Sequence, residues 1–187
     1  GQRGEVGEAG VGGGGGGMAG RRGMDDDGVR AVCAEAAQGE VLEAVNFNTP
    51  GQVVIAGNKG AVERGMEAAK ARGAKRALIL PVSVPSHCAL MKPAAEQLKS
   101  YLEQIAVAQP QVPVLHNADV LAYDNAAQIK DALVRQLFSP VRWVDSVQKM
   151  ASVGIAIAAE CGPGKVLSGM NKRIVAEMPC LALTSAD

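Results

Sequence analysis

Residues 41–57, VLEAVNFNTPGQVVIAG, decide the fold of the first half of the chain. Residues 41–47 are apolar except for Glu43 and Asn46, a pattern typical of a strand, and residues 52–56, QVVIA, are a second, mainly apolar strand pattern. The turn-forming sequence Asn48-Thr49-Pro50-Gly51 separates them. These residues therefore predict two consecutive strands joined by a tight turn.

Further strand and helix patterns flank this pair. The run Asp25-Asp26-Asp27 offers carboxylates to cap a helix whose apolar residues recur at helical spacing. The elements predicted for this part of the chain are a strand at 18–23, a helix at 25–39, strands at 41–47 and 52–56, a helix at 57–73 and a strand at 77–84. The order β-α-β-β-α-β is that of a ferredoxin-like unit, and it closes within residues 18–80.

The beginning of the chain departs from this regularity. Residues 1–17, GQRGEVGEAGVGGGGGG, contain almost nothing to bury, so we expect an irregular segment there. A phosphate-binding loop is the alternative, but no predicted strand or helix frames the glycines. Arg21 and Arg22 fall in the first predicted strand, where burying unpaired cations costs several kcal/mol, so we expect that strand to be frayed or misplaced.

Residues 81–187 again alternate helix and strand patterns. Their strands are too few to close an independent sheet, so we expect this part to belong to a larger α/β layer whose other strands lie upstream of this chain. The predicted elements are a helix at 89–105, a strand at 112–115, helices at 126–138 and 141–151, a strand at 154–159 and a helix at 165–177. The expected class is α/β, with three segments at 1–17, 18–80 and 81–187.

Composition excludes several classes of function. Among 187 residues, 19 Lys and Arg balance 19 Asp and Glu, so the charge expected of a nucleic-acid or acidic-membrane binder is missing. The four cysteines form no C-x-x-C pair and no histidine lies at metal-ligand spacing from them, which argues against a zinc site and a disulfide scaffold, so we expect no metal. No apolar run approaches the roughly 20 residues of a membrane span, and no signal peptide is recognisable. We therefore expect a cytoplasmic protein.

The search for a general base is short, because the chain has two histidines. His87 lies where an apolar strand ends and a helix begins, the position at which open α/β sheets place ligands, and imidazole suits proton transfer near neutral pH. A structural role at the helix start is the alternative. His116 precedes the turn sequence Asn117-Ala118-Asp119, so we expect it to be a solvated turn residue.

A nucleophile is harder to find. Ser86 and Cys88 adjoin His87, but neighbouring residues point in different directions, so His87 is poorly placed to activate either of them. No G-x-S-x-G sequence occurs, and Ser168 falls inside a predicted helix. Residues 162–166, GPGKV, resemble a phosphate loop only superficially, and we expect a strand-to-helix turn with exposed N–H groups there.

Four motifs nevertheless occur in an order typical of one enzyme family. They are NFNTPGQVVIAG at 46–57, PVSVPSHCALM at 81–91, DALVRQLF at 131–138 followed by PVRW at 140–143, and ECGPGKVL at 160–167. Together they resemble the bacterial malonyl-CoA:acyl-carrier-protein transacylases. The resemblance implies an α/β-hydrolase-like acyltransferase domain with an inserted ferredoxin-like subdomain.

The resemblance also implies a reaction and residues for it. The family moves a malonyl group from coenzyme A to the thiol of acyl carrier protein through an acyl-serine ester, with coenzyme A thioester as substrate and no further cofactor. His87 matches the family's base, Gln136 matches the residue whose backbone carbonyl orients that base, and Asn48 matches a position lining the substrate cleft. Without the resemblance, Gln136 is read as an exposed helix residue and Asn48 as a turn former.

Other family motifs do not occur in this sequence: the nucleophilic G-H-S-L-G-E, the G-Q-G near the start and the malonate-binding arginine. We therefore expect an incomplete transacylase that keeps the base but lacks the nucleophilic serine. The alternative is a remnant without catalysis that binds acyl carrier protein or another partner. That alternative requires a shared basic face, for which the candidates are Lys75, Arg76, Lys92, Lys172 and Arg173.

Overall fold

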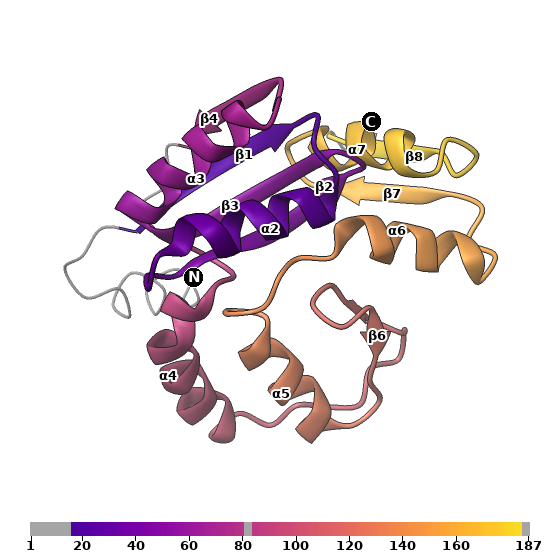
Figure 1. Ribbon diagram of the computed structural model, residues 1–187. Helices are drawn as coiled ribbons and strands as arrows, with labels where there is room; N and C mark the ends of the chain where they lie inside the picture. The colour runs from indigo at the N-terminus through magenta and orange to yellow at the C-terminus, as the bar shows by residue number, and fades with distance from the viewer. Residues whose placement is uncertain (1–15, 81–83, 185–187) are drawn as a thin grey trace.

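A computed structural model describes residues 16–80 and 84–184 of the chain (Figure 1). The first half contains a four-stranded antiparallel sheet with strand order β2-β3-β1-β4 and two helices. Its elements, in chain order, are β1 (Gly16–Arg22), α2 (Asp26–Ala37), β2 (Leu42–Thr49), β3 (Gln52–Asn58), α3 (Lys59–Ala71) and β4 (Arg76–Ile79). The predicted β-α-β-β-α-β order is therefore confirmed.

Local sequence explains where these elements begin and end. The Asp25 carboxylate accepts a hydrogen bond of 2.7 Å from the N–H of Gly28, which caps α2 as expected. Helix α2 ends at Ala37, and the next two residues, Gln38 and Gly39, both have positive φ. Gly51 has φ 71° in the turn between β2 and β3, a conformation that glycine adopts without steric cost.

The first strand corrects one expectation. Strand β1 is neither frayed nor misplaced: it lies inside the sheet, antiparallel to β3 over seven residue pairs and to β4 over four. The ladder joins backbone groups, which every residue of β1 carries, so the arginines at positions 21 and 22 do not prevent pairing. Residues 1–15 of the expected glycine-rich segment, and residues 81–83 of the strand expected at 77–84, lie outside the described residues.

Each face of the sheet has its own apolar cluster. Helices α2 and α3 cover one face, where Ile55 and Val53 of β3 pack with Val29, Cys33, Val62 and Met66. On the other face, Val45, Val54 and Ala56 pack with Cys88, which comes from the segment after β4. The second cluster attaches the remainder of the chain to the sheet.

The second half contains short helices and strands (Figure 1). Helices α4 and α5 pack against each other around Met91, Leu102, Val134 and Leu137, while β7 and β8 form a parallel pair next to α7. Strand β8 is not predicted from the sequence, and the strand expected at 112–115 starts at Leu115. The elements are a 3-10 turn at Ala89–Met91, α4 (Lys92–Glu103), β5 (Leu115–His116), β6 (Leu121–Ala122), α5 (Ala126–Arg135), α6 (Trp143–Ser152), β7 (Ala158–Cys161), α7 (Val166–Ile174) and β8 (Cys180–Leu183).

Candidate active site

His87 lies in the segment between β4 and α4, and its backbone is tied to the end of α5. Its N–H donates a 3.0 Å hydrogen bond to the carbonyl of Leu137. Its φ is 67°, in the left-handed region that residues other than glycine rarely adopt. Such a conformation persists only where the surroundings hold it, and strained residues of this kind cluster at functional sites.

The imidazole of His87 contacts the same segment. Its Nδ1 is 2.8 Å from the backbone carbonyl oxygen of Gln136, the residue that follows α5. A carbonyl oxygen accepts hydrogen bonds and cannot donate one, so Nδ1 must carry the proton. The basic lone pair of the neutral ring is then on Nε2. The sequence resemblance implied this contact, and the structure contains it.

Cys88 anchors the histidine segment to the sheet, and its thiol is shielded from solvent. Its side chain is fully buried between Val45, Val54 and Ala56, and its Sγ donates a 3.2 Å hydrogen bond to the carbonyl of Pro85. Burial raises the pKa of the Cys88 thiol to about 11. At neutral pH the group is therefore a thiol with little nucleophilicity, as its position beside His87 led us to expect.

Asn48 lies on a different element, strand β2, and not in the turn after it. The register of β2 against β3 shifts between Phe47 and Thr49, so Asn48 is the extra residue of a β-bulge. Next to it, the N–H of Phe47 donates a 3.0 Å hydrogen bond to the carbonyl of Val141. Residues 136–141 thus contact His87 at one end and the strand that carries Asn48 at the other.

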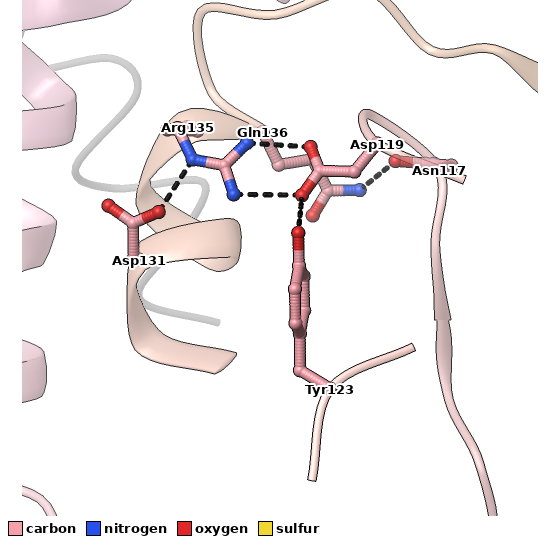
Figure 2. A network of polar contacts seen from close by, with 6 residues as sticks. All are labelled: Asn117, Asp119, Tyr123, Asp131, Arg135 and Gln136. Atoms are coloured by element: carbon pink, nitrogen blue, oxygen red, sulfur yellow. Dashed lines mark hydrogen bonds and ion pairs between the residues drawn. The ribbon is translucent and has the colours of Figure 1, made fainter. Parts of the chain in front are cut away.

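The side chains around Gln136 form a polar network that sequence reasoning missed (Figure 2). The guanidinium of Arg135 donates two hydrogen bonds to the Asp119 carboxylate, at 2.6 and 2.8 Å, and one to Asp131 at 2.6 Å. The Tyr123 hydroxyl donates to Asp119 at 2.6 Å. The i, i+4 spacing of Asp131 and Arg135 is readable in the sequence, but the contacts of Asp119 depend on the fold.

The hydrogen bonds of this network shift the pKa values of its side chains. The hydrogen bonds from Arg135 hold the pKa of Asp119 below its usual range, and Asp119 in turn raises the pKa of Arg135. The hydrogen bond to Asp119 also raises the pKa of Tyr123. His116 is buried, and its ring lies 5.4 Å from the ring of Tyr123, so the expectation of a solvated turn residue was wrong.

Gln136 and Asn117 meet in the same region. The side-chain amide of Gln136 donates a 2.5 Å hydrogen bond to Oδ1 of Asn117, which belongs to the turn between β5 and β6 (Figure 2). The carbonyl of Asn117 accepts a 2.9 Å hydrogen bond from the N–H of Arg142. Gln136 is half-buried, so it is not the exposed helix residue that its helical position alone suggests.

The GPGKV sequence forms the expected turn between β7 and α7, but its helix N-terminus is occupied. The Glu160 carboxylate accepts hydrogen bonds from the N–H groups of Leu167 and Ser168 and from the Ser168 hydroxyl, at 3.1, 2.8 and 2.6 Å. These bonds lower the pKa of Glu160. The expectation of exposed N–H groups was therefore wrong, and Ser168 lies in a helix, bonded to a carboxylate.

Across residues 16–80 and 84–184, no group of three or more His, Cys, Asp and Glu side chains is placed to hold a metal ion. None of the helices in these ranges is long and apolar enough to cross a membrane.

Comparisons with known proteins agree with one another. A family model for the acyl transferase domain matches residues 9–179. The malonyl CoA-acyl carrier protein transacylase of Haemophilus influenzae is 56% identical over 161 residues, which are 86% of this chain and 52% of that protein, and the Bacillus subtilis transacylase is 40% identical over 166 residues, 88% of this chain and 52% of that protein. This chain spans about half the length of the curated relatives it matches.

Solved structures give the same result. A malonyl-transacylase in complex with a type II PKS acyl-carrier protein has a TM-score of 0.96 and 49% identity, covering 99% of this chain and 60% of that one. An acyl carrier protein S-malonyltransferase from Vibrio cholerae has a TM-score of 0.94 and 52% identity, covering 97% of this chain and 59% of that one. The α/β class expected from the sequence is therefore confirmed, with the fold of the acyltransferases.

Proposed function

This chain belongs to the acyl transferase domain family, and from that premise we propose that it supplies the general base of a malonyl-CoA:acyl-carrier-protein transacylase. The observation that carries the proposal is the 2.8 Å contact between His87 Nδ1 and the Gln136 carbonyl oxygen. The substrates would be malonyl-CoA and the thiol of acyl carrier protein, with no separate cofactor. Coenzyme A thioester chemistry of this kind fits the cytoplasmic location expected from the sequence.

In the proposed reaction, His87 transfers protons and does not bond to the acyl group. Nε2 of the neutral ring takes the proton of a serine hydroxyl as the hydroxyl attacks the malonyl thioester, and the proton then goes to the departing coenzyme A thiolate. In the second half, Nε2 takes the proton of the carrier-protein thiol and returns it to the serine oxygen. The Gln136 carbonyl stabilises the imidazolium and fixes the ring, the part that a carboxylate plays in a Ser-His-Asp triad.

The nucleophile of this scheme is not assigned to a residue of the chain. The family's G-H-S-L-G-E motif does not occur among the 187 residues, and Ser168 is bonded to Glu160. For Asn48 we propose a substrate-contacting role, because the bulge in β2 removes it from the regular ladder and a bulge can re-aim a side chain.

A chimera tests the proposal. Residues 24–184 of this chain would replace the matching half of the Haemophilus influenzae transacylase, and malonyl transfer to acyl carrier protein would be followed by intact mass. We expect the chimera to transfer malonyl and its His87→Asn variant to be at least about 100-fold slower. Asparagine is the chosen substitute because it tolerates the positive φ of residue 87.

A folded chimera with equal rates for both forms would show that His87 is not the base, and a folded but inactive chimera would show that this half does not serve the reaction. The matched control is Glu40→Gln, which breaks the surface ion pair of Arg64 with Glu40 far along the sequence from His87.

A second candidate, binding of acyl carrier protein without catalysis, is favoured by one observation. Several of the expected basic residues lie at one end of the four-stranded sheet: Arg76 begins β4 opposite the end of β1, the Lys75 side chain lies beside Gly23, and Arg173 donates a 3.0 Å hydrogen bond to Gln52 in the adjacent hairpin. Carrier proteins are acidic, so a basic surface favours their encounter. We expect the Lys75→Glu/Arg76→Glu chain to lose affinity for acyl carrier protein, whereas unchanged, salt-insensitive binding would reject this surface.

A further inference from the structure

We infer that Asp119 and Arg135 are positioning residues for His87: together with Asn117 they hold the end of α5 so that the Gln136 carbonyl fixes the imidazole. The inference rests on the proposed function, since it assigns residues that prepare the same base. The printed contacts of Asp119 and Arg135 reach His87 through the end of α5 and Gln136.

The ion pair of Arg135 with Asp119 is bidentate, which restricts the relative orientation of the two side chains. Two parallel hydrogen bonds join the guanidinium to both carboxylate oxygens, and this fork arrangement fixes orientation as well as distance. The Asp119 side chain is 10% exposed, in contrast to the open surface pairs that contribute little. The Tyr123 hydroxyl bonds the same carboxylate and restricts it further.

A second hydrogen-bonded contact lies one residue further along the chain. Gln136 follows Arg135 directly, and its amide bonds Asn117, two residues before Asp119. At the end of α5, Arg135 therefore bonds Asp119 and the next residue, Gln136, bonds Asn117 of the same turn, as Figure 2 shows. Such a double contact resists rotation of the helix end, which a single contact would allow.

The turn that receives these contacts is itself constrained. Val120 has φ 61°, which is strained for a β-branched residue, and its N–H donates a 2.8 Å hydrogen bond to the carbonyl of His116. His116 is buried against Tyr123. The turn is thus a fixed support rather than a loop that could follow the helix end.

The Gln136 carbonyl needs such a support. The last carbonyl groups of a helix have no partner within the helix, so their direction depends on how the helix ends. The Gln136 carbonyl meets the His87 ring, and a misplacement of about 1 Å at a reacting group can cost on the order of 100-fold in rate. The Asp119–Arg135 ion pair therefore acts on His87 by fixing the direction of the Gln136 carbonyl.

The test is the tautomer of His87, read by ¹⁵N–¹H correlation of the imidazole nitrogens in the ¹⁵N-histidine-labelled 187-residue chain. The sequence has two histidines, so the signals that disappear in His87→Asn belong to His87 and the remaining signals belong to His116. In the wild type we expect Nδ1 protonated and Nε2 bare. In Asp119→Asn we expect the two nitrogen shifts to move toward each other as the tautomers mix.

Arg135→Lys is the second variant, which keeps the charge and loses the fork, and it should show a smaller shift in the same direction. If Asp119→Asn does not fold, the imidazole shifts of Arg135→Lys decide whether the ion pair positions His87. The matched control is Glu40→Gln: Arg64 is as exposed as Arg135, at 35%, and its pair with Glu40 is also short, but the control should leave the His87 signals unchanged. The inference would be overturned if folded Asp119→Asn and Arg135→Lys kept the wild-type ¹⁵N chemical shifts of His87. An unprotonated Nδ1 in the wild type would overturn it as well.

The chimera separates this inference from the proposed function. In an active chimera, Asp119→Asn should lower kcat about 10- to 100-fold with little change in KM, because substrate contacts stay intact. An inactive but folded wild-type chimera would defeat the proposed function, while the imidazole signals of the 187-residue chain would still decide whether Asp119 and Arg135 position His87.

Discussion

At the scale of single residues, His87 is held by its backbone as much as by its ring. Its N–H bonds the Leu137 carbonyl and its Nδ1 contacts the Gln136 carbonyl, so two successive carbonyl groups after α5 face one residue. The ring is thereby tied to a helix end that is distant in sequence. A histidine positioned in this way needs no carboxylate partner of its own to fix its tautomer.

The left-handed backbone of His87 has a measurable consequence. At φ 67° a Cβ is unfavourable, so His87→Gly should be more stable than His87→Ala by about 1 kcal/mol, the reverse of the order expected at an ordinary position. Urea unfolding of the two variants measures this difference. An alanine variant equal to or more stable than the glycine variant would contradict the backbone conformation described for residue 87.

Asp119 should make stability depend on acid pH. Its folded-state pKa lies below the ordinary 3.8, chiefly because of Arg135, so the ionised form is favoured by folding. This contribution is present above about pH 3.8 and is lost as the pH falls through the lowered folded pKa. The wild type should exceed Asp119→Asn in free energy of unfolding near neutral pH and lose most of that advantage at low pH. A constant difference across this range would reject the ion pair.

At the scale of elements, periodicity and capping predicted most of the helices and strands, because these signals are local. Asp25 caps α2, and the turn at Gly51 joins β2 to β3, both as the sequence indicates. Local signals failed where a distant segment decides the structure. Strand β8 exists as the parallel partner of β7, and the end of β4 depends on its pairing with β1, neither of which a sequence window contains.

Helix α7 provides a prediction at this scale. Glu160, from strand β7, accepts hydrogen bonds from the first N–H groups of the helix and so replaces a capping residue of the helix itself. In Glu160→Gln we expect faster hydrogen exchange at the Leu167 and Ser168 amides, with unchanged exchange in α2. Equal protection of these amides in both proteins would show that the carboxylate does not cap α7.

At the scale of the whole molecule, the site joins segments that are far apart in the sequence. His87 and Gln136 are 49 residues apart, and Asp119 and Arg135 are 16 apart. The first pair was predicted through resemblance to a family, and the second was not, because any of several carboxylates could have met Arg135. The division of the chain at residue 80 into two domains stays a prediction, although each part contains its own apolar cluster.

The folded molecule should also protect its cysteines unequally. Cys161 is exposed and Cys180 half-buried, whereas Cys33 and Cys88 are buried in clusters on opposite faces of the sheet. Alkylation followed by peptide mass analysis should modify Cys161 first and reach Cys33 and Cys88 only after unfolding, since burial raises the pKa of Cys88 as well as blocking access. Modification of Cys88 at the rate of Cys161 would contradict the packing of the histidine segment.

The central claim is that His87, oriented by the Gln136 carbonyl, is the base of an acyl transfer. The most direct measurement is the burst of coenzyme A released when the chimera is mixed with malonyl-CoA in the absence of carrier protein, because it isolates the first proton transfer. We predict that His87→Asn slows this burst by about 100- to 10,000-fold while the protein remains folded. A burst of undiminished rate in the His87→Asn chimera would contradict the claim.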